Sequence, residues 1–248
     1  MLRGLYTSAS GLNLQQTAID VVANNIANLS TTGFKLDRLR VGSFPSILLW
    51  RLEAGKRAEP VGVTCYGALA EAVTTDFREG PLQNTGVLRD VALMGQGFLV
   101  AETPAGERYF RGGTLFLNGD GFLTTGSGDK VLGENGPITL DSGDFRIYED
   151  GTIAVKGKPV DKLRLVDFKD KSGLVKEGRN YFRSDGSVPV AASGTVVRQG
   201  FLEGSNVDIA EEMAKLIVGL RAYQFSQRAF RTHDELLGKA VNQVGKVR

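Results

Sequence analysis

Apolar residues recur with a helical period near both ends of the chain, and they form short runs in between. Near the N-terminus the apolar positions alternate steps of four and three residues, which is the spacing of a coiled-coil seam. Val22 widens this apolar stripe, and Thr31-Thr32-Gly33 is expected to stop the helix, with Gly33 in a left-handed conformation. The first seam consists of Leu5, Ala9, Leu12, Gln16, Ile19, Ala23 and Ile26.

A second and longer seam lies near the C-terminus. Ser205 is the expected N-cap of this helix, with Asp208 three residues later as in a capping box. At 1.5 Å per residue a helix of roughly 40 residues is about 60 Å long, more than the diameter of a small domain. The second seam consists of Ile209, Met213, Leu216, Leu220, Tyr223, Gln227, Phe230, Asp234, Leu237, Val241 and Val244.

The middle of the chain is typical of antiparallel β structure. Of the 32 glycines, 26 lie between Gly42 and Gly204, and they separate short runs such as Phe98-Leu99-Val100. Asn118-Gly119-Asp120-Gly121 and Asp150-Gly151 are hairpin signals. No strand–helix–strand alternation is present, which argues against a doubly wound sheet. We therefore predict an α+β fold: an N-terminal helix of a core α domain (1–35), a connecting segment (36–61), a central antiparallel all-β domain (62–203) and a C-terminal helix of the same α domain (204–248).

The connecting segment contains a dense apolar patch from Phe44 to Leu52, including Trp50, the only tryptophan. Two interpretations are open. The patch packs onto the chain's own β domain, or it forms an adhesive surface for a neighbouring subunit.

Composition narrows the class of protein. The net charge of +2 is too balanced for a nucleic-acid binder, and the chain lacks an apolar run long enough to span a membrane. The single cysteine, Cys65, excludes an internal disulfide and is expected to be a small buried hydrophobe. Arg3 is not followed by the apolar core of a secretory signal, which favours either a cytosolic protein or export without cleavage.

Catalytic and cofactor motifs are weak throughout. Gly95-Gln96-Gly97 lacks the third glycine of a dinucleotide fingerprint, and a turn is expected there. The only histidine, His233, is expected at a surface or interface, since no nucleophile elbow is present. Sequence alone leaves open a catalytic, glycosidase-like pair of carboxylates that folding brings together. We nevertheless expect that the protein is not an enzyme and has no cofactor or metal site.

The two seams predict association between copies of the chain. One buried stripe leaves so long a helix marginally stable, so further faces must be covered, and we expect poorly ordered ends in an isolated monomer. Two seams of different length suit head-to-tail contacts, which form rings or helical tubes. The alternative is an intramolecular helical hairpin. Gln16, Gln227 and Asp234 interrupt the seams and either fix their register or face water.

Both ends of the chain resemble the bacterial flagellar rod and hook proteins. The resemblance is carried by Ala23-Asn24-Asn25-Ile26-Ala27-Asn28, by Thr32-Gly33-Phe34-Lys35 and by the run from Gly200 to Asp208, continuing through Arg221-Ala222-Tyr223-Gln224. It implies a structural subunit of the flagellar basal-body rod, polymerising through paired terminal helices into a stiff tube that transmits torque from motor to hook. The implied partners are other copies, neighbouring axial proteins and the flagellar export apparatus, and the implied location is the cell envelope, in its periplasmic or cell-wall zone, without a cleaved signal.

The compact stretch from Val41 to Pro60 resembles the shorter rod proteins, while Gln224 replaces a more common glutamate, so the position in the rod, proximal or distal, stays open. The competing hypothesis is a glycan-binding or glycan-active β module of the cell wall, multimerised by a coiled coil. The expected subunit-interface residues are Leu5, Leu12, Gln16, Ile19, Asn24, Asn25, Ile26, Asn28, Phe34, Leu48, Trp50, Ile209, Met213, Leu216, Leu220, Tyr223, Gln227, Phe230, Leu237 and Val241.

Overall fold

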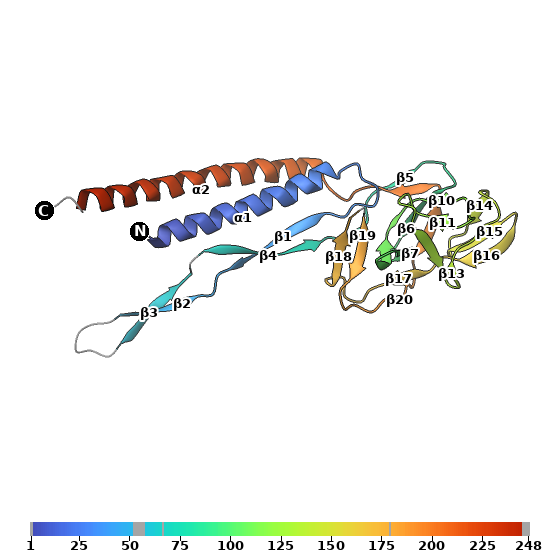
Figure 1. The fold of residues 1–248 in the computed structure, drawn as a ribbon, viewed down its shortest axis with the longest axis horizontal. Coiled ribbons are helices and arrows are strands. Elements are labelled where there is room, and N and C mark those ends of the chain that lie inside the picture. The colour runs from blue at the N-terminus through green and yellow to red at the C-terminus, as the bar shows by residue number, and fades with distance from the viewer. Residues whose placement is uncertain (1, 52–57, 66, 179, 245–248) are drawn as a thin grey trace. The chain divides into compact units, whose positions relative to one another are not determined.

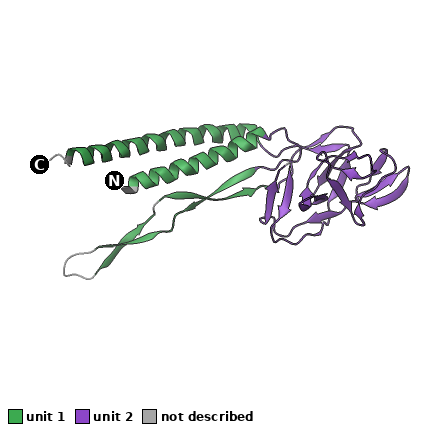
Figure 2. Ribbon diagram, viewed as in Figure 1, with its two compact units in different colours: residues 1–27, 37–76, 208–248 green, residues 28–36, 77–207 purple. Residues whose placement is uncertain are grey.

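The computed structural model describes residues 2–51, 58–65, 67–178 and 180–244. It confirms the predicted α+β class, with a helix at each end and antiparallel strands between them (Figure 1). The chain divides into two compact units, each assembled from separate stretches of sequence (Figure 2). Unit 1 comprises residues 1–27, 37–76 and 208–248, and unit 2 comprises residues 28–36 and 77–207.

Unit 1 is helical, with two antiparallel strand pairs. The two helices run side by side in opposite directions (Figure 1). β1 pairs with β4, and β2 pairs with β3, each time antiparallel. The elements are α1 (Leu2–Ala27), β1 (Asp37–Ser43), β2 (Ile47–Arg51), β3 (Glu59–Thr64), β4 (Ala68–Thr75) and α2 (Ile209–Val244).

The start of α2 differs from the sequence prediction. The Asp208 carboxylate accepts hydrogen bonds from the backbone N–H groups of Ala210 and Glu211, at 2.8 and 3.2 Å, so Asp208 is the N-cap. The Ser205 hydroxyl instead accepts a bond from the Val207 N–H, in unit 2. The prediction of Ser205 as N-cap is wrong because both residues are good caps, and only the backbone path decides between them.

β structure begins earlier than the sequence indicated, at Asp37. In β1 apolar Leu39 and Val41 alternate with Arg38 and Arg40, a period of two that the charged residues obscured. The strands β2 and β3 form a separate two-stranded ribbon, which contains most of the apolar patch; Leu52 lies outside the described residues. The segment between α1 and the β body is therefore strand-rich.

Unit 2 is built from antiparallel strands. The largest sheet has the order β10-β11-β12-β7-β8-β19-β18, and β13, β17 and β20 pair beside this path. Smaller sheets have the orders β21-β6-β9, β14-β15-β16 and β22-β5. The strands are β5 (Leu82–Asn84), β6 (Asp90–Met94), β7 (Phe98–Thr103), β8 (Gly106–Phe110), β9 (Gly112–Thr114), β10 (Phe116–Leu117), β11 (Leu123–Thr124), β12 (Lys130–Gly133), β13 (Gly136–Pro137), β14 (Phe145–Ile147), β15 (Thr152–Val155), β16 (Lys158–Lys162), β17 (Leu165–Asp167), β18 (Leu174–Glu177), β19 (Tyr181–Ser184), β20 (Val190–Ala191), β21 (Val196–Gln199) and β22 (Phe201–Glu203).

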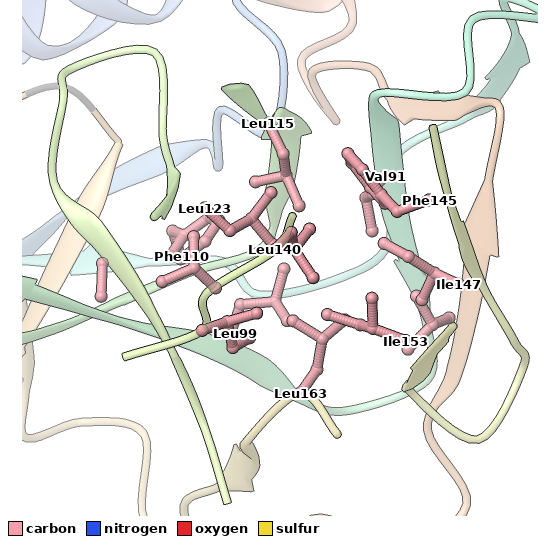
Figure 3. Packing of buried hydrophobic residues seen from close by; sticks show 14 of the residues in the cluster. Val91, Leu99, Phe110, Leu115, Leu123, Leu140, Phe145, Ile147, Ile153 and Leu163 are labelled. Carbon is pink, nitrogen blue, oxygen red and sulfur yellow. The ribbon is translucent and has the colours of Figure 1, made fainter. Parts of the chain in front are cut away.

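The apolar core of the molecule lies in unit 2. Figure 3 shows aliphatic and aromatic side chains from several strands converging there, among them Leu99, Leu123 and Ile153, which are fully buried. A second cluster consists largely of rings, with Phe98 packed edge-on against Phe168 and Phe182. Unit 2 therefore has the interior of an independently stable domain.

The two predicted hairpin turns of unit 2 are confirmed. The Asn118 carboxamide oxygen accepts bonds from the N–H groups of Asp120 and Phe122, closing the turn between β10 and β11. Gly151 has a φ of +87° and lies between β14 and β15. The prediction for Cys65 is wrong: the residue is exposed, because it directly follows β3, which belongs to the two-stranded ribbon and not to a covered sheet.

Candidate functional site

The contact between α1 and α2 is made at small residues. A Cβ atom added to Gly4 would lie 2.7 Å from Cε1 of His233, and one added to Gly219 would lie 3.2 Å from Cγ1 of Ile19. Gly11 likewise faces Ser226. These contact positions on α2 repeat every seven residues, so the antiparallel pair keeps a heptad register with glycine in successive layers. Close approach of the two backbones follows from the absence of side chains at these points.

Asn25 links three elements at the end of this helix pair. Its side-chain N–H donates to the backbone oxygen of Asp37 at 2.8 Å and to Oε2 of Glu212 at 3.0 Å, and its carboxamide oxygen accepts the Asp37 N–H at 3.0 Å. Asn25 and Glu212 are 1% and 2% exposed. A buried amide satisfied on both sides is geometrically demanding, so Asn25 fixes α1, β1 and α2 in one register.

Glu212 also takes part in a charged cluster on the first turns of α2. Lys215 Nζ lies 2.7 Å from a carboxylate oxygen of Glu211 and 2.7 Å from Oε1 of Glu212. The hydrogen bond from Lys215 lowers the pKa of Glu211. Burial opposes the charge on Lys215, but its two carboxylate partners outweigh this effect and raise its pKa. Glu211 therefore stays ionised at the positive end of the α2 dipole.

Only every other residue of the predicted α2 seam lies where a seam residue should. At the remaining positions the preceding residue in the sequence takes that place. Leu216, Tyr223, Phe230 and Leu237 are half-buried, as a seam requires. The alternate seam positions are occupied in the structure by Glu212, Gly219, Ser226 and His233. Their apolar neighbours Ile209, Met213, Ile217 and Leu220, here called the α2 stripe, are between 43% and 52% exposed. Unit 1 thus presents a continuous apolar surface to water along the first half of α2.

The β2–β3 ribbon is a second exposed apolar surface. Leu48 pairs with Val63 across the ribbon, and Trp50 pairs with Pro60 beyond a register shift. Trp50 is 54% exposed. An isolated two-stranded ribbon is marginally stable in water, so cover for these side chains would stabilise it.

In unit 2 a buried ion-pair cluster joins the two segments that lead to the helices. Lys35 Nζ lies 2.7 Å from Oε1 of Glu203 and donates to the Arg78 oxygen at 2.7 Å, while Arg111 Nε lies 3.2 Å from Oε2 of Glu203. Lys35 is fully buried, and this burial lowers its pKa, although Glu203 opposes the shift. The cluster holds residues 28–36 against β22.

The predicted interface residues fall into three groups. Asn25 and Phe34 are buried inside the chain, where Phe34 packs with Leu36 and Val207, so neither side chain is on the surface of its unit. The exposed group is Gln16, Asn24, Leu48, Trp50, Ile209, Met213, Leu220 and Val241. The half-buried group is Leu5, Leu12, Ile19, Ile26, Asn28, Leu216, Tyr223, Gln227, Phe230 and Leu237; the side chain of Val244, the last seam position, lies outside the described set.

Sequence reasoning missed the residues that pair the helices. Gly4, Gly11 and Gly219 were not singled out, although the seven-residue interval between Gly4 and Gly11 is a readable signal. His233 does lie at an interface, but an intrachain one. Gln16 is exposed and donates to Asp20 at 2.9 Å on its own helix.

Within residues 2–51, 58–65, 67–178 and 180–244, His, Cys, Asp and Glu do not form a group of three suited to a metal ion. Neither described helix combines the length and apolar character that a membrane span requires.

Comparisons with known proteins agree with the position of the helices. The family described as flagella basal body rod protein matches residues 5–35, and the family described as flagellar basal body rod FlgEFG protein C-terminal matches residues 198–244. These matches cover α1 with the following turn, and the strands leading into α2 with α2 itself.

Full-length relatives extend the similarity across the β unit. The flagellar basal-body rod protein FlgG of Bacillus subtilis is 33% identical, with 98% of this chain and 99% of that protein covered. FlgG of Borreliella burgdorferi is 34% identical over 98% of both chains, and the rod protein FlgF of Caulobacter vibrioides is 33% identical over 100% of both. These relatives are structural proteins and not enzymes, and they give no support to a glycan-binding or glycan-active module. The chain belongs to the family of bacterial flagellar basal-body rod proteins, and its location is the flagellar basal body.

Proposed function

We propose that this rod protein polymerises through α1 and α2 into a stiff helical tube that transmits torque from the motor to the hook. The observation that carries the proposal is the α2 stripe, in which Ile209, Met213, Ile217 and Leu220 remain about half exposed after α1 has packed. Exposed apolar surface of this extent is typical of a protein–protein contact.

The α1–α2 pair supports stiffness in such a tube. Glycine layers bring the helix backbones close together, and Asn25 fixes their register. A close-packed helix pair resists bending more than a loosely packed one, because its side chains have no free volume to move into. Further copies packed on the α2 stripe would add contacts of the same kind and complete the marginal helices.

The β2–β3 ribbon supports a second contact between copies. Leu48 and Trp50 are exposed, and a large aromatic side chain on an exposed ribbon is a common anchor of an interface. We propose that this ribbon packs against a neighbouring subunit or a neighbouring axial protein.

The proposal includes delivery through the flagellar export apparatus to the periplasmic or cell-wall zone, without a cleaved signal. The single cysteine supports this route, since the chain carries no internal disulfide that would oppose passage in an unfolded state. The test is secretion of the full chain by a flagellated host that lacks the chromosomal copy, compared with a host whose export apparatus is inactive. Recovery of the same amount of secreted protein from both hosts would contradict export through this apparatus.

The polymerisation proposal is tested by electron microscopy and sedimentation of purified protein at rising concentration. The variant Ile217→Gln with Leu220→Gln removes the centre of the α2 stripe, and Val175→Gln with Val188→Gln makes the same chemical change at exposed positions of unit 2. We expect polymers from the parent and the unit 2 control, and a rise of about tenfold or more in the threshold concentration for the stripe variant.

A chain lacking residues 206–248 provides a second arm. We expect it to form no polymers, because α2 is gone. Polymers of normal appearance from the truncated chain, or an unchanged threshold for the stripe variant, would contradict assembly through the terminal helices.

A further inference from the structure

An apolar groove lies in unit 1 where α1, α2 and β1 come together. It has a volume of about 590 Å³, and its apolar lining includes Ala18, Ile19 and Val22 from α1, Leu39 from β1, and Val218 from α2. Val218 is 66% exposed. The size is that of a site for several side chains of a partner and not for a single water.

The lining of this groove also carries charged side chains, of which Glu212 is buried. Asp37, Glu211 and Glu212 contribute three carboxylates, and Arg38 and Lys215 contribute two cations. The balance is therefore acidic by one charge. A partner segment with an apolar face and a basic side chain matches this surface.

The other end of unit 1 supplies a segment of that kind. α1 has 26 residues and α2 has 36, so at 1.5 Å per residue α2 is longer by about 15 Å. Since Gly4 lies against His233 and α1 begins at Leu2, the residues of α2 from Leu236 onward extend past the beginning of α1. Figure 1 shows the end of α2 reaching beyond the start of α1. We call residues 236–244 the α2 overhang.

The α2 overhang is apolar and basic. Leu236 and Val241 are 48% and 71% exposed. Lys239 lies between them, and the sequence after Glu235 contains no acidic residue. The overhang has no counterpart on α1, so it lacks the cover that α1 gives to the rest of the helix.

We propose that the α2 overhang of one copy docks in the α1–α2–β1 groove of a second copy, with Val241 near Val218 and Lys239 facing the Glu211 side of that groove. The proposal rests on the assembly function proposed above and names the head-to-tail contact within it. Groove and overhang lie at opposite ends of the same helix pair, so each copy uses both surfaces at once. Such a contact does not close on itself as a dimer and propagates along a line of subunits.

Cysteine cross-linking tests this contact in the full chain. Cys65→Ser first removes the exposed native thiol, and Val218→Cys and Val241→Cys are then introduced together. The two positions are 23 residues apart on one helix, about 34 Å, so a disulfide within one chain is excluded by the ~7 Å limit between bridged Cα atoms. Every disulfide in this variant therefore joins two molecules.

We expect oxidation with diamide to give a ladder of dimers, trimers and larger species. Val188→Cys with Val241→Cys is the matched control, since Val188 is an exposed valine of unit 2. The cross-linked fraction should exceed that of the control about tenfold or more, because docking raises the effective concentration of the two thiols. Lys239→Glu should lower the yield, and Glu211→Lys should restore it.

A further readout comes from two chains that each carry one cysteine, Val218→Cys or Val241→Cys, in the Cys65→Ser background. When these chains are mixed and oxidised, the head-to-tail contact predicts a mixed dimer and little of either homodimer. Efficient homodimers of the Val241→Cys chain, or a ladder no stronger than that of the control, would overturn the proposal. Electron microscopy of the same samples keeps the two proposals apart. Polymers without the 218–241 cross-link contradict only the groove contact, whereas polymers of the stripe variant at the parent's threshold concentration contradict assembly through the α2 stripe.

Discussion

The side-chain amide of Asn25 donates a 3.0 Å hydrogen bond to the carboxylate of Glu212, and both residues are almost fully buried between α1 and α2. The same amide pairs with both backbone groups of Asp37. One side chain thus sets the relative position of three elements of unit 1, the unit that carries the proposed contacts between subunits.

Replacing Asn25 by leucine should destabilise unit 1 by about 2–4 kcal/mol. The change removes three hydrogen bonds and leaves the buried Glu212 carboxylate with Lys215 as its remaining ion-pair partner. The measurement is loss of helical circular dichroism in urea, at one protein concentration for all variants. Asn13→Ala, at an exposed position of the same helix, should stay within about 0.5 kcal/mol of the parent. Equal midpoints for the two variants would show that Asn25 does not fix the helices.

Replacing Gly4 or Gly238 by alanine should affect the stability of the helices differently. Gly238 has open space around its missing Cβ, so Gly238→Ala should stabilise α2 by up to about 1 kcal/mol through helix propensity. At Gly4 the His233 ring occupies that space, so Gly4→Ala should give no gain or a loss. Adding His233→Ala should recover the gain, and the same urea titration measures all four chains. A gain from Gly4→Ala alone would contradict the close helix contact.

Lys35→Met should destabilise unit 2 by about 3–5 kcal/mol, because it leaves the buried charge of Glu203 with one cationic partner, Arg111. Arg164→Gln breaks the ion pair between Arg164 and Glu107, which is of similar length. Because both side chains of this pair are partly exposed, the loss of stability should be at most about 1 kcal/mol. Thermal unfolding of the two variants gives the comparison. A smaller loss for Lys35→Met than for Arg164→Gln would rule out a stabilising role for the cluster.

Trp50 provides a direct optical signal of assembly. It is the only tryptophan and is 54% exposed, so its emission should be red-shifted in dilute protein and should move to shorter wavelength as polymers form. Trp50→Ala should leave urea unfolding of the dilute protein within about 0.5 kcal/mol of the parent while raising the polymerisation threshold about tenfold. Emission that is unchanged by concentration would place Trp50 outside the subunit contacts.

The two terminal helices and the β body could be read from the sequence because their signals are local. The four-and-three spacing from Leu5 to Ile26 and from Ile209 to Val241 identifies helices, and Asn118-Gly119 identifies a hairpin. The family resemblance, carried by the residues around Asn25 and Phe34, is also confirmed.

The face on which the helices meet could not be read in the same way. Periodicity marks apolar residues, but α1 and α2 approach through Gly4, Gly11 and Gly219, which carry no hydrophobic signal. Met213 and Leu220 therefore look like the buried seam in sequence and are exposed in the structure. Asn25 was predicted at the subunit interface, and the sequence does not show that Asp37 and Glu212 satisfy its side chain within the chain.

Amide hydrogen exchange, compared between dilute protein and polymers, tests most directly whether sister copies complete the terminal helices. Slow exchange in the β-unit core should be common to both states. The amides of α1 and of the α2 stripe should exchange readily in dilute protein and become strongly protected in polymers. Helices that are already fully protected in dilute protein, with no change on assembly, would contradict the account.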